Sequence, residues 1–430
     1  MKREIINDLV KWKNRSDRKP LILLGARQVG KTFILKEFGR RYYKNTAYIN
    51  CDSNALVKDL FKADYDIDRI LLAIGSITGE SIIPGETLII LDEIQELHRG
   101  LNALKYFCEN APQYHVAVAG SLLGITLHQG ESYPVGKVNT IEMHPMTFSE
   151  FLLAKGRDKM VDLLRQKQWD VIASLSSLYT QILREYYFVG GMPEAVKTFI
   201  ATNDAVKVRE VQKEILLAYD KDISKHAPAN EAVRINQVWK SIPAQLAKEN
   251  RKFIYGVVRS GARAKDYEVA LQWLLDAGLV HMVERVRTPA MPLKCYANFA
   301  SFKLFMLDCG LLGAMSDTPP ALMLVPNEIK ESKGQFTENY VCTQLHAISN
   351  MGVYYYSKEN STQEVDFVVQ HDTLIAAIEV KSEENLRSKS LKAFHSDNPE
   401  VKCLRASMLD YIEQEWMTNV PLYGIAAYWE

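Results

Sequence analysis

Lys31 and Thr32 follow a loop bounded by two glycines, a set of residue types that suits the binding of a polyphosphate. The pattern Gly-x-x-x-x-Gly-Lys-Thr lies between apolar residues 21–24, typical of a buried strand, and residues 33–38, typical of a helix. Glycine lets the main-chain amides turn around an anion, and the helix N-terminus adds partial positive charge. Lys31 would contact the β- and γ-phosphates, and the Thr32 hydroxyl would hold Mg²⁺. The predicted nucleotide-binding residues are Gly25, Ala26, Arg27, Gln28, Val29, Gly30, Lys31 and Thr32.

Two adjacent carboxylates, Asp92 and Glu93, end a second apolar run that begins at residue 87. In proteins with such a loop, the carboxyl end of a central strand faces the phosphates. We expect Asp92 to bind Mg²⁺ directly or through water, and Glu93 to polarise the attacking water. A solvated strand end is the structural alternative, but a distance of ~60 residues from the loop favours catalysis. Ser121, after the apolar strand at 115–119, is a candidate sensor of the γ-phosphate or the water.

Composition restricts the class of protein. Of the 430 residues, 52 are Lys or Arg and 52 are Asp or Glu, so the whole chain has no electrostatic bias toward nucleic acid or an anionic membrane. The six cysteines are scattered without a Cys-x-x-Cys pair or a His cluster, which argues against a zinc site or a disulfide framework and favours a reducing cytosol. No signal-peptide core and no apolar run of roughly 20 residues are present. We therefore expect a cytoplasmic protein that makes no membrane contact.

The order of apolar strands and helices predicts an open parallel sheet with helices on both faces over residues 1–155. Together with the loop and acid motifs and the stretch Ala119-Gly120-Ser121, this order resembles the AAA-type ATPases. Residues 132–138 and 144–151 resemble, more narrowly, a family of prokaryotic ATPases that carry a C-terminal domain of unassigned role. The resemblance implies ATP as the nucleotide, and no Asn-Lys-x-Asp motif for guanine is evident.

Residues 156–225 are predicted to form a helical lid that one Gly-Gly-Met-Pro stretch interrupts. Pro193 then stands at an early position of the next helix. The stretch resembles the Gly-x-Pro motif of STAND-type signal-transduction ATPases, in which the proline packs near the nucleotide, and an ordinary interhelical turn is an equal alternative. Three residues are candidates for an arginine finger, and the sequence does not rank them: Arg27, Lys137 and Arg184.

Residues 226–318 combine helical segments with two strands, at 279–286 and 302–307, an order typical of a winged helix. Winged helices often bind DNA. The segment from Lys248 to Arg287 contains eight basic and five acidic residues, however, a modest excess for a DNA-binding surface. A packing or protein-contact role is therefore favoured over DNA binding.

Residues 319–430 form the last predicted domain, after Pro319-Pro320 and a polar run at 330–334. Asp366 alternates with apolar residues on one predicted strand, and Glu379 and Lys381 point to the same side of the next strand. An acid followed by Glu-x-Lys resembles the PD-(D/E)xK restriction-endonuclease-like domains. The resemblance implies that Asp366 and Glu379 share Mg²⁺, with Glu338 of the preceding helix as a further acid and Lys381 stabilising developing charge. A buried acid–lysine network that only holds the fold is the alternative.

The predicted fold class is thus α/β: a P-loop parallel sheet with a helical lid, a winged-helix-like middle domain and a C-terminal restriction-endonuclease-like domain. Two functions remain open. In the first, the chain binds and hydrolyses ATP with Mg²⁺ and its nucleotide state controls a nuclease-like domain that acts on nucleic acid. In the second, it is a regulatory or scaffold ATPase whose C-terminal domain binds a protein partner without catalysis. Homo-oligomers are compatible with both.

Overall fold

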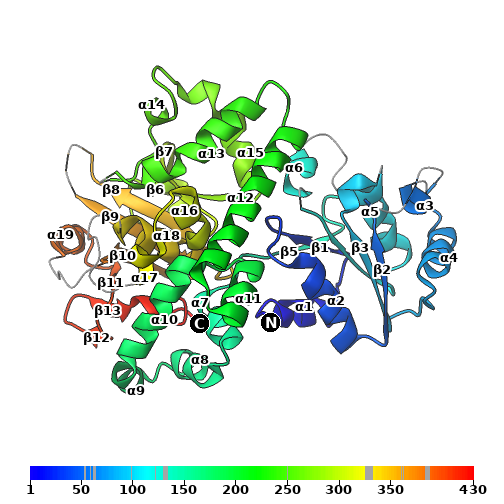
Figure 1. Ribbon diagram of the computed structural model, residues 1–430, viewed down its shortest axis with the longest axis horizontal. Helices are drawn as coiled ribbons and strands as arrows, with labels where there is room; N and C mark the ends of the chain where they lie inside the picture. The colour runs from blue at the N-terminus through cyan, green and yellow to red at the C-terminus, as the bar shows by residue number, and fades with distance from the viewer. Residues whose placement is uncertain are drawn as a thin grey trace. The chain divides into compact units, whose positions relative to one another are not determined.

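Two separate sheets organise the chain (Figure 1). The computed structural model divides into two compact units, one of Lys2–His144 with Asp276–Gly278 and the other of the remaining residues. The structure describes residues 1–52, 55–58, 60–61, 64–97, 99–121, 123–128, 134–248, 250–324, 333–359, 361, 363–382 and 388–430. Residues 132–133 of the family-like stretch and 330–332 of the predicted boundary lie outside these ranges. No helix in the described ranges is long and apolar enough to cross a membrane.

The sheet of the smaller unit is parallel throughout, with the order β2-β3-β4-β1-β5, which confirms the predicted parallel sheet. Its strands are β1 (Leu21–Leu24), β2 (Asn45–Asn50), β3 (Thr87–Asp92), β4 (His115–Ala119) and β5 (Asn139–Glu142). Because β4 lies between β1 and β3, the segments that follow these three strands meet at one edge of the sheet.

Helices cover this sheet and explain its apolar strands. They are α1 (Ile6–Lys13), α2 (Lys31–Tyr42), α3 (Ala55–Lys58), α4 (Ile67–Thr78), α5 (Gly100–Asn110) and α6 (Leu123–His128). Ile89 and Leu91 of β3 share a buried cluster with Ile70 of α4 and Phe107 of α5, while α2 packs on β2, β3 and β4. Strands β3 and β4 are buried along their whole length, so their sequences are nearly continuous apolar runs.

The larger unit begins with a run of helices. They are α7 (Phe148–Ala154), α8 (Asp158–Arg165), α9 (Trp169–Ser174), α10 (Ser176–Val189), α11 (Pro193–Thr202), α12 (Ala205–His226), α13 (Ala232–Leu246), α14 (Tyr255–Val258) and α15 (Glu268–Asp276). Local signals set several starts: Thr147 and Glu150 form a capping box at α7, and the Asp204 carboxylate accepts from two amides at the start of α12.

The second sheet has eight strands in the order β12-β13-β11-β10-β9-β8-β6-β7. They are β6 (Val280–Val286), β7 (Ala297–Met306), β8 (Gly352–Ser357), β9 (Glu364–His371), β10 (Leu374–Val380), β11 (Lys402–Ser407), β12 (Ile412–Glu413) and β13 (Thr418–Pro421). The β6–β7 hairpin joins the sheet because β6 pairs in parallel with β8. Strands from both sides of residue 318 therefore share one sheet.

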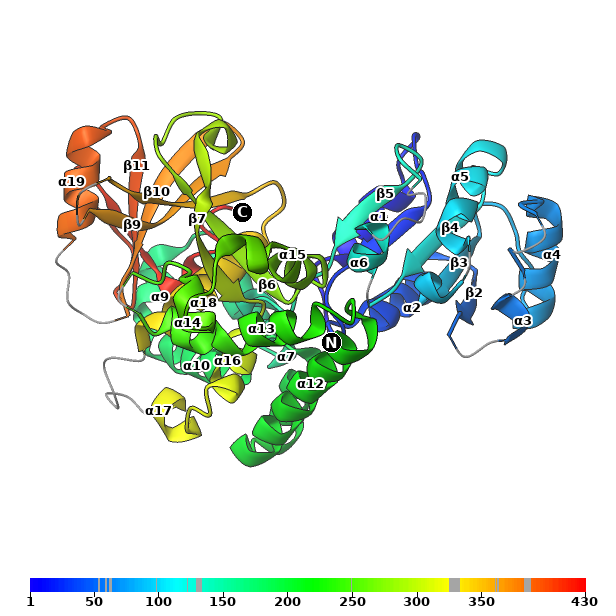
Figure 2. The ribbon, with the colours of Figure 1, turned by 90° about the horizontal axis from the view of Figure 1, so that it is seen from above.

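Four helices complete the larger unit: α16 (Cys309–Met315), α17 (Pro320–Leu324), α18 (Lys333–His346) and α19 (Lys389–Asp397). Helix α18 contacts β7, β8 and β10, and α19 contacts β9 and β10 (Figure 2). Along the chain the order is α18, β8, β9, β10, α19 and β11. Strand β9 pairs antiparallel with both β8 and β10, and β11 pairs in parallel with β10.

Candidate functional site

The loop between β1 and α2 has the backbone that its two glycines predict. Gly25 and Gly30 have φ values of 136° and 101°, a region that side chains disfavour. A Cβ added at Gly25 would lie 2.2 Å from the carbonyl oxygen of Met143. Ala26 and Val29 are buried and anchor the loop, whereas Arg27 and Gln28 are exposed. The loop is therefore a defined backbone turn in which replacement of Gly25 would force a displacement.

The side chain of Lys31 is folded over this loop. Its ammonium donates to the carbonyl oxygens of Gly25, at 2.7 Å, and Ala26, at 2.8 Å. Lys31 is only 7% exposed. Burial lowers the pKa of Lys31 to about 8, against the opposing effect of the Glu93 and Asp92 charges. The ammonium is thus a poorly solvated cation at the place where the sequence predicts phosphates.

Thr32 and Asp92, the two residues predicted to hold Mg²⁺ in this part of the chain, lie together. The Thr32 hydroxyl donates to Asp92 Oδ2 at 2.7 Å, and the Tyr48 hydroxyl of the neighbouring strand β2 donates to the same oxygen at 3.1 Å. Burial, followed by the charge of Asp92, raises the pKa of Tyr48 to about 12, so this hydroxyl keeps its proton. The set of a hydroxyl and a carboxylate oxygen is one that Mg²⁺ prefers, and these residues fit a magnesium ion. Tyr48 was not predicted from the sequence.

Glu93 and Ser121 also lie together. Glu93 Oε2 accepts from the Ser121 amide at 3.1 Å and from its hydroxyl at 3.2 Å. Gln95 Nε2 donates to the same oxygen at 2.6 Å. Glu93 adopts a left-handed backbone conformation, with φ 52°, which is uncommon for residues other than glycine. Gln95 was missed from the sequence, where a polar residue two positions after the acid pair was the available signal.

The other predicted nucleotide residues lie elsewhere. Pro193 opens α11 in the larger unit, where the preceding Gly191 amide donates to Asp308 Oδ2 at 2.5 Å and the Met146 amide donates to the Gly191 carbonyl at 2.7 Å. Arg184 lies on α10 of the same unit, and Lys137 forms an ion pair with Glu109 at 2.9 Å in the smaller unit. The predicted roles of these three side chains toward a nucleotide stay predictions.

The C-terminal acids form a second group, which we name the carboxylate cluster and which consists of Glu338, Glu364, Asp366 and Glu379. Ile378 pairs with Phe367 across β10 and β9, and Asp366 and Glu379 are the next residues along these strands. The Val380 amide donates to Asp366 Oδ2 at 2.8 Å. Lys381 Nζ lies 3.0 Å from Glu379 Oε1. The predicted acids and lysine are therefore close neighbours on one part of the sheet.

Two cations that the sequence reasoning missed face this cluster. Arg251 Nη1, between α13 and α14, lies 2.5 Å from Glu338 Oε1. Lys303 Nζ, on β7, lies 2.7 Å from Glu364 Oε1 and 3.9 Å from Asp366 Oδ1. Lys303 is completely buried. A lysine in the apolar run of β7 was the available signal, because a buried ammonium needs a carboxylate.

The predicted role of Glu338, Asp366 and Glu379 as metal ligands stays a prediction, and the surrounding side chains do not favour it. Within the described ranges, no group of three or more His, Cys, Asp or Glu residues could hold a metal ion. The physical reason is that Arg251 and Lys303 already pair with the acids, where a metal would require their oxygens. We derive no reaction step through a metal in the C-terminal domain.

The electrostatics of the cluster reflect its burial. Burial, followed by the charge of Asp366, raises the pKa of Glu338 to about 8, although Arg251 and Lys303 oppose this effect. Burial would lower the pKa of Lys303, but Glu338, Glu364 and Asp366 together outweigh it and raise the pKa. The lysine therefore stays charged because of its carboxylate neighbours.

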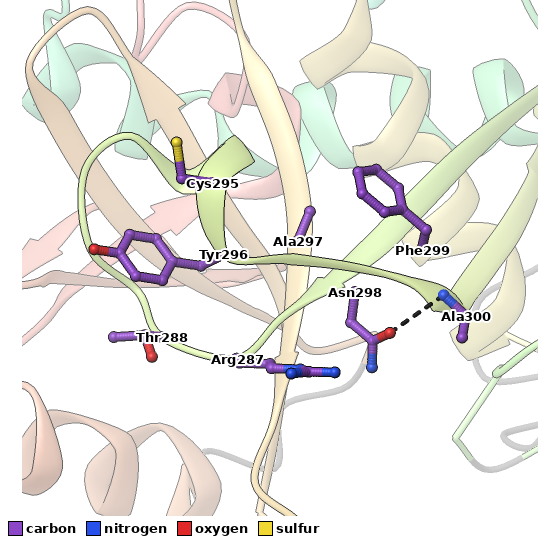
Figure 3. Close-up of a pocket in the computed structure, with 8 residues that line it drawn as sticks. All are labelled: Arg287, Thr288, Cys295, Tyr296, Ala297, Asn298, Phe299 and Ala300. Atoms are coloured by element: carbon purple, nitrogen blue, oxygen red, sulfur yellow. Dashed lines mark hydrogen bonds between the residues drawn. The ribbon is translucent and has the colours of Figure 1, made fainter.

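A separate hollow of about 440 Å³ lies at the distal end of the β6–β7 hairpin (Figure 3). Arg287, Tyr296 and Phe299 are among its lining residues, and none of the predicted site residues lines it. Phe299 is 68% exposed. The hollow is therefore an open surface feature, distinct from both groups of functional candidates.

Comparison with protein families divides the chain into three stretches. Residues 17–152 match the model of an AAA domain. The N-terminal stretch is therefore similar to AAA domains, and we call it the AAA domain. This AAA domain includes the loop of residues 25–32 and the acid pair, so the match and the site geometry agree. Residues 180–322 match a domain of unknown function (DUF8612), and residues 333–423 match another (DUF4143), which leaves the winged-helix and nuclease-like interpretations as proposals.

Solved structures share a distant likeness. The Walker-type ATPase PABY2304 of Pyrococcus abyssi is 16% identical, with a TM-score of 0.45 over 73% of this chain and 95% of that chain. The Orc1 protein of Aeropyrum pernix, in complex with DNA, is 12% identical, with a TM-score of 0.27 over 75% and 92%. Cdc6p from Pyrobaculum aerophilum is 14% identical, with a TM-score of 0.25 over 72% and 90%. The comparison with curated proteins found no match.

Proposed function

We propose that the chain binds ATP with Mg²⁺ and hydrolyses it in the AAA domain. The observation that carries this proposal is two hydrogen-bonded pairs among the candidate residues: Thr32 donates to Asp92, and Ser121 donates to Glu93. Thr32 and Asp92 are 60 positions apart along the chain, and Glu93 and Ser121 are 28 apart. The fold thus brings together the residue types that phosphoryl transfer to water requires.

Each residue then has a role in the reaction. Lys31 and the loop amides bind the phosphates, and Thr32 with Asp92 would hold Mg²⁺, which neutralises charge that develops on the phosphate oxygens. Glu93 orients the attacking water and accepts its proton. Ser121 and Gln95 hold the Glu93 carboxylate in place through the bonds described above. The test is calorimetry with ATP and Mg²⁺, followed by measurement of phosphate release. Absence of nucleotide binding by folded protein would overturn the proposal.

We further propose that residues 319–430 are a nuclease-like domain. Its support is the order of elements from α18 to β11, one helix, three antiparallel strands, a second helix and a parallel strand, with the acids on α18, β9 and β10. In this proposal residues 156–225 act as a lid that transmits the nucleotide state of the AAA domain, and nucleic acid is the ligand.

Residues 226–318 are proposed to be a winged-helix-like module. Helix α13 is followed by a bridge between Lys252 and Lys303, then by α14, α15 and the β6–β7 hairpin. A short strand that pairs with the last strand of the hairpin is the arrangement such modules use. This module shares the eight-stranded sheet with the nuclease-like domain, so we expect the two to move together.

The second candidate function is a regulatory or scaffold ATPase whose C-terminal domain binds a partner without cutting it. The contacts of Arg251 with Glu338 and of Lys303 with Asp366 favour it, because they engage acids that a nuclease would give to metal. Incubation of a mixed DNA and RNA panel with Mg²⁺ or Mn²⁺, with and without ATP, separates the two functions. Cleavage by wild type that is lost in Lys381→Ala, with ATP turnover intact, supports the nuclease, and no cleavage supports the second candidate.

A further inference from the structure

Four cations face the four acids of the carboxylate cluster. Arg251 lies against Glu338, Lys303 lies against Glu364 and Asp366, and Lys381 lies against Glu379. Arg405 of β11 pairs with Glu379 of β10 in the parallel ladder. Burial lowers the pKa of Arg405, and the negative charge of Glu379 opposes this effect. Because the pKa of Glu338 is raised to about 8, this acid is mostly protonated near neutral pH, and the four cations more than offset the other three acids. A divalent ion would therefore add further positive charge to a largely buried place.

The two cations from outside the predicted nuclease-like domain are built into the fold. Lys303 is fully buried on β7, and its ammonium lies against Glu364 of β9, so the folded sheet encloses this cation. Arg251 has a left-handed backbone, with φ 50°, immediately before the bridge from Lys252 to Lys303. A Cβ added to Gly334 would lie 2.7 Å from Arg251 Nη2, which places the guanidinium closely against the start of α18.

The acids nevertheless retain oxygen atoms with which to bind a cation. Glu338 Oε2 and Glu379 Oε2 are buried without a hydrogen-bond partner among the residues that the structure describes. If Arg251 and Lys303 lost their charges, these oxygens and those of Asp366 would remain as hard ligands around uncompensated negative charge.

We propose that Arg251 and Lys303 permanently occupy the role of a divalent metal ion in the carboxylate cluster, so that this domain binds its partner without cutting it. The inference rests on the nuclease-like fold proposed above, and it replaces metal catalysis in that domain with a structural function. The cations join the winged-helix-like module to the C-terminal acids, and metal dependence is then confined to the AAA domain.

The decisive experiment is calorimetric titration of the nucleotide-free full chain with Mn²⁺. Wild type and Asp366→Asn are expected to give the same isotherm, because Asp366 binds no metal in either. The double variant Arg251→Met with Lys303→Met should gain one Mn²⁺ site, and adding Asp366→Asn should remove it. A wild-type Mn²⁺ site that Asp366→Asn abolishes would overturn the inference, as would a folded double variant that gains no site.

Further variants keep the test decisive if the double variant folds poorly. Circular dichroism should show that Mn²⁺ restores the structure of the double variant. If Mn²⁺ does not restore it, and Arg251→Met alone gains no Mn²⁺ site, the inference is contradicted.

Arg251→Met combined with Glu338→Gln removes a cation together with its acid. This variant should melt within about 3 °C of wild type and should not bind Mn²⁺. Lys358→Met, which breaks an exposed ion pair with Asp397 in the same unit, is the matched control and should leave both readouts unchanged. If the wild-type chain does not turn over ATP, the proposed function fails and this inference stands. If the wild-type chain binds Mn²⁺ through Asp366, this inference fails and the proposed function stands.

Discussion

The AAA domain holds one group of candidate residues, Lys31, Thr32, Asp92, Glu93 and Ser121, which we call the AAA site. The acids of this site and those of the carboxylate cluster have hydrogen-bond or ion-pair partners that differ in charge. Asp92 accepts from the neutral hydroxyls of Thr32 and Tyr48, and Glu93 accepts from Ser121 and Gln95. In the cluster the acids face guanidinium or ammonium groups instead. Neutral partners orient a carboxylate and leave its charge for a metal or a water, whereas cationic partners cancel that charge. We infer that the charge of the partners, more than the acids themselves, separates the proposed reactive site from the proposed structural one.

The two buried lysines show the same contrast. Lys31 donates to two carbonyl oxygens, and burial lowers its pKa to about 8. Lys303 is buried more completely, yet its three carboxylate neighbours raise its pKa. Lys31 is therefore a cation that gains from an incoming phosphate, while Lys303 already has its counter-charges.

The largest expected effect is on nucleotide binding. Lys31→Ala should abolish measurable ATP binding, because it removes the cation that contacts the phosphates. Calorimetry with ATP and Mg²⁺ is the measurement. Lys44→Ala, which alters an exposed ion pair with Glu86 in the same unit, should bind as wild type does. Binding that survives in Lys31→Ala would remove this lysine from the site.

Glu93→Gln should separate binding from hydrolysis. The amide keeps the size of the side chain but cannot accept a proton, so we expect ATP affinity to persist and turnover to fall by about 10²–10⁴-fold. Phosphate release under saturating ATP measures this loss. Unchanged hydrolysis would show that another group activates the water.

Lys303→Met should destabilise the larger unit without affecting the AAA site. Removal of one partner of a buried ion pair costs about 3–5 kcal/mol, because the acids keep their charge without compensation. Denaturant unfolding of the full chain, monitored by circular dichroism, measures the cost, and ATP affinity is the internal control. A variant as stable as wild type would mean that Lys303 does not compensate these acids.

A smaller effect is expected at Gln95. Gln95→Ala removes one of the hydrogen bonds that position Glu93, so turnover should fall by roughly tenfold while ATP affinity stays constant. Steady-state kinetics give both values. A loss as large as that of Glu93→Gln would instead place Gln95 directly on the reacting water.

The smallest predicted effect is on the pH dependence of binding. Because the pKa of Lys31 is lowered to about 8, its ammonium loses its proton as the pH rises through that value. ATP affinity should therefore fall roughly fourfold between about pH 7 and about pH 8.5. Lys31→Arg stays charged over this range and, where it binds ATP, should show a flat profile. A flat profile in wild type would contradict the assigned charge state.

The sequence allowed the AAA site to be predicted because its signals are local. Residues 25–32 are contiguous, and Asp92, Glu93 and Ser121 each follow an apolar strand, so the rules of a parallel sheet bring them to one edge. Tyr48 and Gln95 escaped because a lone polar residue near a strand end has many possible partners.

For the carboxylate cluster, the sequence predicts the acids and the lysine on β9 and β10 but not the two cations that come from earlier in the chain. Asp366, Glu379 and Lys381 are close in sequence, and strand periodicity places them together. Arg251 and Lys303 are 87 and 63 residues from their partners Glu338 and Asp366, and no local pattern pairs them. Their contacts depend on the β6–β7 hairpin joining β8, which the hairpin sequence alone does not indicate.

The contrast between the two sites is tested most directly by electron paramagnetic resonance, which counts the Mn²⁺ ions bound to the full chain. The count is made with and without a non-hydrolysable ATP analogue, in wild type, Asp92→Asn and Asp366→Asn. We predict one tightly bound Mn²⁺ per chain that requires both the analogue and Asp92 and that is indifferent to Asp366. A Mn²⁺ ion that remains without the analogue and is lost in Asp366→Asn would contradict this account.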